Sequence, residues 1–580
     1  MARRIVRRTL PDPLPPLPSG LPPVLARVYA GRRVIAPLEI EYGLGRLHPY
    51  TGLAGMDGAV ALLADAVEQD QRVLVVGDFD ADGATSSALM LRSLRGMGAR
   101  HVDYLVPNRF EYGYGLTPEI VAVAAQRRPD LIVTVDNGIA SLDGVQAARD
   151  LGIRVLVTDH HLPGPALPEA DAIVNPSCPG DAFPSKHLAG VGVAFYVMAA
   201  LRAELRRRGW FARRALAEPN LASVLDLVAL GTVADVVPLD HNNRVLVAQG
   251  LARIRAGLGC PGVRALARVA GRDPARLTAT DLGYALGPRL NAAGRLADMS
   301  LGIACLLADE EAEALRLARE LDALNAERRA VEAEMHAQAL AALEDLDLAD
   351  EGGLPAGLCL FDAGWHPGVV GILASRIKDR LHRPVVAFAP GVNGELRGSG
   401  RSVAGLHLRD ALESVSTRHP GLLARFGGHA MAAGVSLAPG AFASFAEAFD
   451  REVRRRIDPD GLAGVLLTDG PLAPDEVSLD LAEALRDGGP WGQGFPEPLF
   501  DGAFEVVERR PVGERHLRAT LRMPEGGRLV DAMAFNALEQ PWPGAGGGVR
   551  LAYRLEVNEW QGARTARLVV EEVEPLPDGG

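Results

Sequence analysis

Three aspartates alternate with other residues in the stretch VGDFDADGATSS, which begins at Val76, and a glycine follows them. They are Asp78, Asp80 and Asp82. Carboxylates this close together repel one another unless a cation neutralises them, and carboxylate oxygens are good ligands for divalent metals. The stretch therefore predicts a cation site. The question it raises is whether the cation is structural or takes part in chemistry.

One structural explanation is a calcium loop, in which oxygen ligands at the first, third and fifth positions precede a glycine at the sixth. Counted from Asp78, Gly83 fits this pattern. The twelfth position should be glutamate, but it is Leu89, and a strand-like segment precedes the cluster where a calcium loop has a helix. A plain turn rich in Asp and Gly explains one or two carboxylates but not three. The sequence thus favours a catalytic cation.

Further polar residues follow other strand-like segments and supply more ligands. Asp136 ends one such segment, and Asp159, His160 and His161 end another. The apolar segment LDLVALGTVADVVPL carries Asp235, which we expect to approach the same edge. Mixed oxygen and nitrogen ligands in this number suit two divalent ions that share a carboxylate, an arrangement that hydrolyses phosphoesters. One imidazole among carboxylates favours Mn²⁺.

These residues need a scaffold that brings strand ends together. Short apolar runs alternate with helix-length segments between residues 70 and 240, which is the pattern of β–α units feeding a parallel sheet. Sites in open parallel sheets lie at the carboxyl ends of the strands. The expected strands lie in RVLVVGD (72–78), VDYLVPN (102–108), LIVTVDN (131–137) and IRVLVTDHH (153–161).

Length and composition limit the class of protein. The 580 residues should hold several domains, and 48% hydrophobic with 5% aromatic residues is typical of a soluble globular chain. The longest uncharged apolar run, LAGVGVAFYVMAAL, is shorter than the ~20 residues of a membrane helix. Gly190 and Gly192 weaken that run as a helix, so we expect no membrane span. The four cysteines form no C-x-x-C pair, which favours a reducing, cytoplasmic location. The net charge of −12 argues only mildly against a nucleic-acid partner, because it does not exclude a local basic groove.

The remaining segments predict further elements. Residues 309–351 contain neither Gly nor Pro and predict one long helix of ~55 Å, or two packed helices that break near Asn325. Residues 355–455 read as a second α/β region. After residue 460 alternating strands predict a small antiparallel β domain, which we expect to be a barrel.

Four motifs, DFDADGATS, VDNG, TDHH and GTVADVVPL, resemble in order and spacing those of the DHH phosphoesterases. Most pyrophosphatases of that superfamily have a histidine four residues before the first metal aspartate, whereas Val76 stands there in this chain. The departure points to the RecJ branch, whose members are single-strand-specific 5′→3′ DNA exonucleases. The resemblance covers roughly residues 40–575. It extends through VPNRFEYGYGL (106–116), GPRLNAAGRL (287–296), GWHPGVVGILASR (364–376), GSGRS (398–402) and FGGHAMAAG (426–434).

The resemblance implies an α/β fold in which a DHH-type parallel-sheet domain is joined by a long helix to a DHH-associated α/β domain, followed by an OB-like β-barrel domain. The expected parts are a Pro/Arg-rich tail (1–40), the DHH phosphoesterase domain (41–265), a helical region with the connecting helix (266–352), the DHH-associated substrate-binding domain (353–458) and the OB-like DNA-binding domain (459–580).

The resemblance also implies roles for individual residues at the catalytic centre. The metal ligands would be Asp80, Asp82, Asp136, His160 and Asp235, holding two Mn²⁺ or Mg²⁺ ions. Asp159 would orient or join these ligands, and His161 would contact the scissile phosphate. Asp78 would either bind metal or support a ligand.

A second set of residues would bind the DNA. Arginine suits phosphate because its planar fork donates two hydrogen bonds, although any single arginine is more often a surface ion pair. Tyr114 would stack on a base, with a packing role as the alternative. Gly428 and His429 lie in the glycine-rich loop of the DHH-associated domain. The other candidates are Arg109, Arg289, Asn291, Arg295, Arg376 and Arg401.

The resulting hypothesis is a monomeric, metal-dependent exonuclease that acts on single-stranded DNA in recombination and repair, with a single-strand-binding protein and a helicase as partners implied by the resemblance. One alternative is a DHH phosphodiesterase of short RNA or cyclic dinucleotides, which would not need the long helix or the β domain. Another is a catalytically silent scaffold, which the intact Asp82, Asp136, His160 and Asp235 disfavour.

Overall fold

The computed structural model describes residues 3–18, 20–106, 115–344, 355–391, 394–457, 464–524, 526–538 and 540–576. The chain forms two compact units. The N-terminal unit comprises Leu10–Asn325 and Glu483–Glu497. The C-terminal unit comprises Met1–Thr9, Ala326–Ala482 and Pro498–Gly580.

A five-stranded parallel sheet, in the order β3-β2-β4-β5-β6, organises the N-terminal unit and confirms the predicted β–α pattern. Strands β2 and β4 are buried at every residue, as expected for strands covered on both faces. The strands are β2 (Val73–Gly77), β3 (Val102–Leu105), β4 (Leu131–Val135), β5 (Arg154–Thr158) and β6 (Ala172–Val174).

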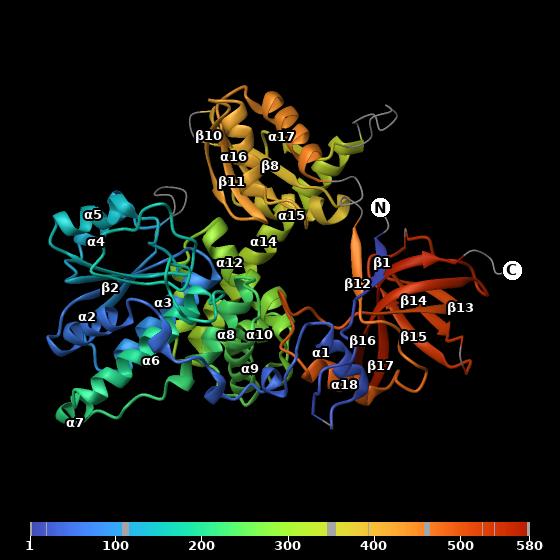
Figure 1. Ribbon diagram of the computed structural model, residues 1–580, viewed down its shortest axis with the longest axis horizontal. Helices are drawn as coiled ribbons and strands as arrows, with labels where there is room; N and C mark the ends of the chain where they lie inside the picture. Colours follow the sequence, from blue (N-terminus) through green and yellow to red (C-terminus); the bar gives the residue numbers. More distant parts are fainter. Residues whose placement is uncertain are drawn as a thin grey trace. The chain divides into compact units, whose positions relative to one another are not determined.

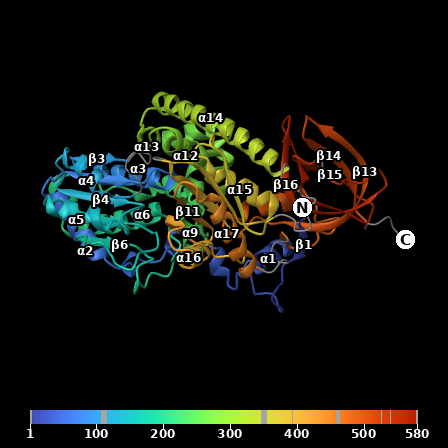
Figure 2. The ribbon, with the colours of Figure 1, turned by 90° about the horizontal axis from the view of Figure 1, so that it is seen from above.

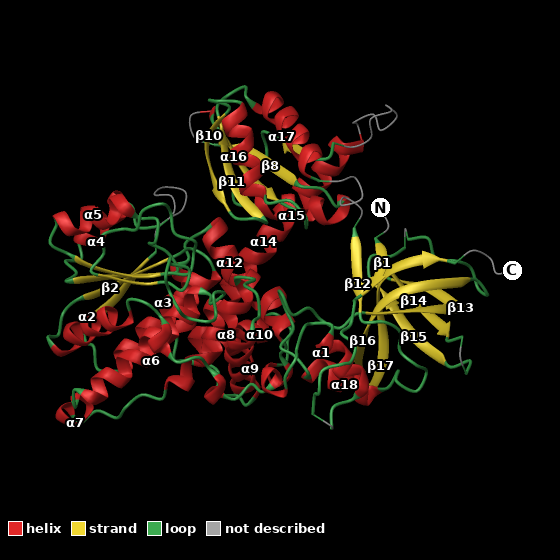
Figure 3. Ribbon diagram, in the orientation of Figure 1, coloured by secondary structure: helices red, strands yellow, loops and turns green. Residues whose placement is uncertain are grey.

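Helices cover both faces of this sheet (Figure 3). On one face α4 and α5 pack on alternate strand residues such as Val76, Ile132 and Val157. On the other face α3 and α6 pack against each other. These helices are α2 (Met56–Glu68), α3 (Ala81–Gly96), α4 (Pro118–Ala125), α5 (Leu142–Asp150) and α6 (Gly190–Arg207).

The segment in which two glycines were expected to weaken a helix forms α6, an 18-residue helix. Burial of its apolar residues outweighs the cost of ~1 kcal/mol for each glycine. Gly190 is the first residue of α6, where a Cβ atom would lie 2.6 Å from the Asp136 Cβ. The glycine is therefore needed for a close approach. Within the described part of the chain, no helix is both long and apolar enough to span a membrane.

The rest of the N-terminal unit is mainly helical, and Asp235 directly follows α8. The long helix α14 is continuous through Asn325, so the alternative of two packed helices is wrong (Figure 2). The part of that prediction beyond residue 344 lies outside the described residues. These helices are α1 (Pro23–Ala30), α7 (Trp210–Arg214), α8 (Leu225–Ala234), α9 (His241–Arg255), α10 (Pro261–Val269), α11 (Ala279–Asp281), the π-helix η6 (Leu282–Leu286), α12 (Gly287–Leu296), α13 (Ser300–Leu307) and the part of α14 (Glu311–Glu344) up to Asn325, after which α14 belongs to the C-terminal unit. Short 3-10 turns are η1 (Pro37–Ile40), η2 (Leu44–Arg46), η3 (Tyr50–Gly52), η4 (Leu221–Val224) and η5 (Pro274–Arg276).

The C-terminal unit contains a second five-stranded sheet, in the order β10-β11-β9-β8-β7, as the second α/β region predicted. Aromatic residues of β8 and α17, among them Phe388, Phe445 and Phe449, form much of its core. The strands are β7 (Leu358–Phe361), β8 (Val385–Pro390), β9 (Leu396–Arg401), β10 (Leu423–Gly428) and β11 (Ala432–Leu437), and the helices are α15 (Val370–Leu381), α16 (Leu408–Arg418), α17 (Phe442–Arg456) and the part of α18 (Leu479–Asp487) up to Ala482.

The predicted β-barrel is present and closes in the order β13-β14-β15-β17-β16 (Figure 1, red). The expectation that it is wholly antiparallel is wrong, because β15 and β17 pair in parallel. A closed ring of five strands cannot alternate direction at every pairing, so one pairing must be parallel. The strands are β13 (Phe500–Val512), β14 (His516–Arg522), β15 (Leu529–Ala534), β16 (Gly548–Trp560) and β17 (Ala563–Pro575).

The first 40 residues, expected to be a tail, contain ordered elements instead. Strand β1 (Arg4–Arg7) pairs in parallel with β12 (Val465–Thr468), and α1 belongs to the N-terminal unit. The Arg7 guanidinium donates to the fully buried Asp501 carboxylate at 2.9–3.2 Å. A buried carboxylate requires such a partner, which gives a physical reason for β1 to be held in place.

Candidate metal centre

Strand register places three of the predicted acidic residues side by side. Gly77 of β2 pairs with Val135 of β4, and Val135 pairs with Thr158 of β5. The residue that follows each strand end is an aspartate, and Asp78, Asp136 and Asp159 are all buried. Asp136 has a φ of 62°, a left-handed conformation uncommon outside glycine. Backbone strain of this kind concentrates at functional sites.

The start of α3 holds Asp80 and Asp82 in place. Asp80 is the N-cap residue, and its Oδ1 accepts hydrogen bonds from Asp82 N at 2.9 Å and Gly83 N at 3.1 Å. The two carboxylate oxygens of Asp82 accept from the first N–H groups of α6, Gly190 N at 2.6 Å and Val191 N at 2.9 Å. The helix N-terminus favours the ionised carboxylate because its N–H groups carry partial positive charge.

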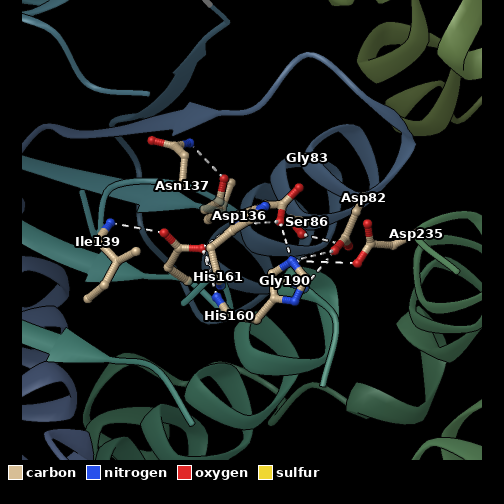
Figure 4. A network of polar contacts seen from close by, with 12 residues as sticks. Asp82, Gly83, Ser86, Asp136, Asn137, Ile139, His160, His161, Gly190 and Asp235 are labelled. Carbon is tan, nitrogen blue, oxygen red and sulfur yellow. Dashed lines mark hydrogen bonds and ion pairs between the residues drawn. The ribbon is translucent and has the colours of Figure 1, made fainter. Parts of the chain in front are cut away.

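His160 lies among three of the carboxylates (Figure 4). Its Nε2 is 3.1 Å from Asp136 Oδ1, 3.5 Å from Asp235 Oδ2 and 3.9 Å from Asp82 Oδ2. Asp235 reaches this position from the C-terminal end of α8. The helical segment 225–239 therefore delivers its carboxylate to the sheet edge, as expected from the sequence.

His161 is paired with Asp159 instead. Its Nδ1 lies 2.8 Å from Asp159 Oδ1, and Asp159 also accepts the backbone N–H of Ile139 at 2.9 Å and of His160 at 2.7 Å. Asp159 is fully enclosed, whereas the His161 side chain is 31% exposed. The pair thus joins a fixed carboxylate to an imidazole that solvent can reach.

The carboxylates disturb one another in the metal-free protein. Burial, and then the charge of Asp80, raise the pKa of Asp82 to about 7. Burial, followed by the charge of Asp82, also raises the pKa values of Asp136 and Asp235 well above their usual range. A cation bound among these groups would remove the repulsion and favour their ionised forms.

The Asp159–His161 pair has the opposite electrostatics. Burial opposes ionisation of Asp159, but the hydrogen bond and charge of His161 outweigh it and lower the pKa of Asp159. Burial likewise lowers the pKa of His161, and the Asp159 carboxylate outweighs this effect, so that the pKa of His161 is raised to about 9. The imidazole is therefore protonated at neutral pH when no metal is bound.

The donor set fits divalent metal ions. Among the described residues, ligand atoms within 4.8 Å of one another occur in three overlapping groups, and Asp136 belongs to two of them. Carboxylate oxygens with one or two imidazole nitrogens suit Mn²⁺ or Mg²⁺ rather than a thiolate-binding metal. The groups are Asp78 with Asp80 and Asp136, Asp82 with His160 and Asp235, and Asp136 with His160 and His161.

The predicted DNA-binding residues are distributed over both units. In the N-terminal unit, Arg289 of α12 forms an ion pair with Asp322 at 2.8 Å, and Arg295 lies on the same helix. Asn291 Oδ1 accepts the backbone N–H of Ala81, which lies between Asp80 and Asp82. Arg109 and Tyr114 lie outside the described residues, so their roles stay predictions.

The four remaining candidates belong to the C-terminal unit. Arg376 pairs with Glu332 at 3.0 Å, and the Arg401 guanidinium donates to Ser399 and Gly400 of its own strand. Gly428 has a φ of +141°, which suits glycine, and His429 lies at the exposed turn of the β10–β11 hairpin. The structure brings together the metal-ligand candidates, and the roles of these four residues stay predictions.

Several supporting residues were not identified from the sequence. Asn137 donates its side-chain amide to the carbonyls of Val76 and Val135, which ties the ends of β2 and β4 together. Asn175 and Ser177 donate to the carbonyls of His161 and His160 at 2.9 Å. Asn137 lies within the motif VDNG, so the sequence could have indicated its role. Asn175 and Ser177 lie in no such motif.

Comparison with known proteins agrees with this geometry. The model of the DHH family, N-terminal domain, matches residues 72–232, the DHHA1 domain model matches residues 355–455, and the RecJ OB domain model matches residues 468–572. The fold and the centre thus define a protein of the DHH class.

Curated relatives identify the family within this class. The chain is 54% identical to the single-stranded-DNA-specific exonuclease RecJ of Salmonella typhimurium, over 99% of this chain and 100% of the relative. It is 54% identical to that of Escherichia coli, over 98% and 99%. The crystal structure of RecJ in complex with Mn²⁺ from Thermus thermophilus matches with a TM-score of 0.78 and 31% identity, over 99% of this chain and 80% of that one. The chain belongs to the RecJ family.

Proposed function

We propose that this chain is a metal-dependent exonuclease that hydrolyses single-stranded DNA from its 5′ end and acts in DNA recombination and repair. The observation that carries the proposal is the convergence of Asp80, Asp82, Asp136, His160 and Asp235 at one sheet edge, in a chain that belongs to the RecJ family along nearly its whole length.

These five residues would hold two divalent ions, Mn²⁺ or Mg²⁺, and Asp78 lies close enough to join them. When bound, such ions lower the pKa of water to give a nucleophile and stabilise the leaving oxygen of a phosphodiester. The chain's own contribution is to fix the ligands. Asp82 is fixed by α6, Asp80 by the first turn of α3, and Asp136 by the end of β4.

His161 would contact the scissile phosphate. Asp159 binds its Nδ1, so Nε2 is the nitrogen that would donate to a phosphate oxygen. An N–H donor beside the phosphate would stabilise negative charge that develops during hydrolysis. Asp159 would act by holding this ring in orientation.

The wider assignment rests on the family. Arg109, Arg289, Arg295, Arg376, Arg401, Tyr114, Gly428 and His429 would bind the DNA strand. The enzyme would work as a monomer in the cytoplasm, with a single-strand-binding protein and a helicase as partners. The domain boundaries expected after residues 40, 265, 352 and 458 are part of the same proposal.

An oligonucleotide labelled separately at each end tests the polarity. With Mn²⁺ present, we expect the 5′ label to be released first from single strands and little release from blunt duplex. Earlier release of the 3′ label would reject the polarity. Equal turnover of short RNA or cyclic dinucleotides would favour the smaller DHH phosphodiesterases instead.

The Asp82→Ala variant tests the assignment of the centre. We expect it to lose nuclease activity while keeping its circular dichroism spectrum. Unchanged activity would remove Asp82 from the metal centre and would favour a silent scaffold.

A further inference from the structure

Asn291 makes a hydrogen bond that does not correspond to the DNA-binding role expected from its motif. Its Oδ1 accepts from the backbone N–H of Ala81 at 2.8 Å. Ala81 is buried and lies between Asp80 and Asp82, two of the proposed metal ligands. The amide oxygen of the half-buried Asn291 therefore contacts the segment that carries Asp80 and Asp82.

The hydrogen bond completes the capping of α3. The first N–H groups of a helix have no partner within the helix and need one from outside. Asp80 Oδ1 accepts those of Asp82 and Gly83, and Asn291 accepts that of Ala81. The orientation of the Asp80–Asp82 turn consequently depends on a side chain more than 200 residues away in sequence.

The helix that carries Asn291 also packs tightly on two of the segments that would supply ligands. A Cβ atom at Gly294 would lie 1.7 Å from the Phe79 carbonyl oxygen, so α12 rests directly on the chain before Asp80. A Cβ atom at Gly287 would lie 3.0 Å from the Ala234 Cβ, next to Asp235. One helix therefore contacts the backbone beside both Asp80 and Asp235.

We propose that Asn291 is a positioning residue of the metal centre, which fixes the Asp80–Asp82 turn through the Ala81 N–H, and that it does not bind DNA. The inference rests on the proposed function, since it presumes that Asp80 and Asp82 bind metal.

The test measures metal binding without DNA. Mn²⁺ is titrated into metal-free protein, and the free ion is followed by electron paramagnetic resonance. We expect Asn291→Ala to weaken Mn²⁺ binding at least ~10-fold, the range found when residues that orient metal ligands are replaced. Asn291→Asp keeps an oxygen for the Ala81 N–H and should recover most of the affinity.

Asn220→Ala is the matched control, because Asn220 Oδ1 also accepts a backbone N–H, that of Ala222 at 3.0 Å, at the start of η4. It should leave Mn²⁺ binding unchanged. In nuclease assays at fixed Mn²⁺, Asn291→Ala should lower kcat with little change in the KM for single-stranded DNA.

Three outcomes would overturn the inference. The first is normal Mn²⁺ binding by Asn291→Ala together with a raised KM, which would make Asn291 a DNA contact. The second is an Asn291→Asp variant no better than Asn291→Ala. The third is an equal loss in the Asn220→Ala control. Failure of the proposed function is distinct, because the unsubstituted protein itself would then bind no Mn²⁺.

Discussion

Asp235 illustrates at the residue scale how function opposes stability. Its carboxylate lies 3.5 Å from His160 and belongs to a cluster whose members raise one another's pKa values. Without metal, this crowding of buried like charges is unfavourable. The same crowding provides the oxygen ligands that a divalent ion requires. Conservative amide substitutions should therefore separate the two effects.

The Asp235→Asn variant should lose nuclease activity at least ~100-fold, because a catalytic metal contributes several kcal/mol to transition-state stabilisation. In EDTA its melting temperature should rise by a few degrees, roughly the effect of 1 kcal/mol in a unit of this size. Nuclease assays and melting curves on the same preparations check both. A lower melting temperature of Asp235→Asn in EDTA would contradict the expectation that repulsion among these carboxylates destabilises the metal-free protein.

The raised pKa of Asp235 predicts that the effect of Asp235→Asn on stability depends on pH. The folded-state pKa of Asp235 lies above its unfolded value of ~3.9, so the folded protein holds this proton more tightly. The contribution of Asp235 to stability is therefore lost as pH rises from about 4 toward the raised pKa. In EDTA the stability advantage of Asp235→Asn should widen between pH 4 and pH 7. Saturating Mn²⁺ should reverse it, and a difference that does not vary with pH would contradict the assignment.

At the scale of elements, the first residue of α6 must be small because it packs against the candidate metal centre. Gly190 donates its N–H to Asp82 and leaves room for Asp136, where a Cβ atom would lie 2.7 Å from Oδ1. The two glycines near the start of this segment predicted a weak helix. The helix forms because its apolar residues are buried, and its first glycine is required by the neighbouring ligand.

The Gly190→Ala variant should bind Mn²⁺ at least ~10-fold more weakly, because the added methyl group must displace Asp136. Gly58→Ala in α2 is the matched control, since its Cβ would meet only the Ala172 Cβ at 3.6 Å. That control should keep its Mn²⁺ affinity and gain up to ~1 kcal/mol in stability. Mn²⁺ titration and chemical denaturation measure the two quantities. Equal Mn²⁺ affinity in both variants would argue against the close approach.

At the scale of the whole molecule, the first residues of the chain belong with its last domain. Strand β1 pairs with β12, and Arg7, Thr468 and Arg550 all donate to the buried Asp501 carboxylate. Burial opposes the ionisation of Asp501, but these donors outweigh it and lower its pKa. Of the segment that the sequence presented as a basic, proline-rich tail, the first nine residues are thus part of the C-terminal unit, and the rest belongs to the N-terminal unit.

The Arg7→Ala variant should destabilise the C-terminal unit by about 1–3 kcal/mol, because it deprives a buried carboxylate of one of its two charged partners, Arg7 and Arg550. Arg4→Ala is the control, since Arg4 is exposed on the same strand, as Arg7 is, but has no ion pair with Asp501 among the described residues. Differential scanning calorimetry should show a lowered transition for Arg7→Ala alone. The same lowering in both variants would indicate that β1 contributes only its backbone pairing.

The sequence by itself determined the chemistry and the local scaffold. Apolar runs that end in Asp78, Asp136 and Asp159 specified a parallel sheet with acidic strand ends, because the pattern of apolar and polar residues along a strand is a local property. Only the tertiary structure decided which distant groups complete the centre. Gly190 meets Asp82 and Asn291 meets Ala81 through contacts between residues 108 and 210 positions apart. Such contacts depend on how helices pack over the sheet, and no local pattern records them.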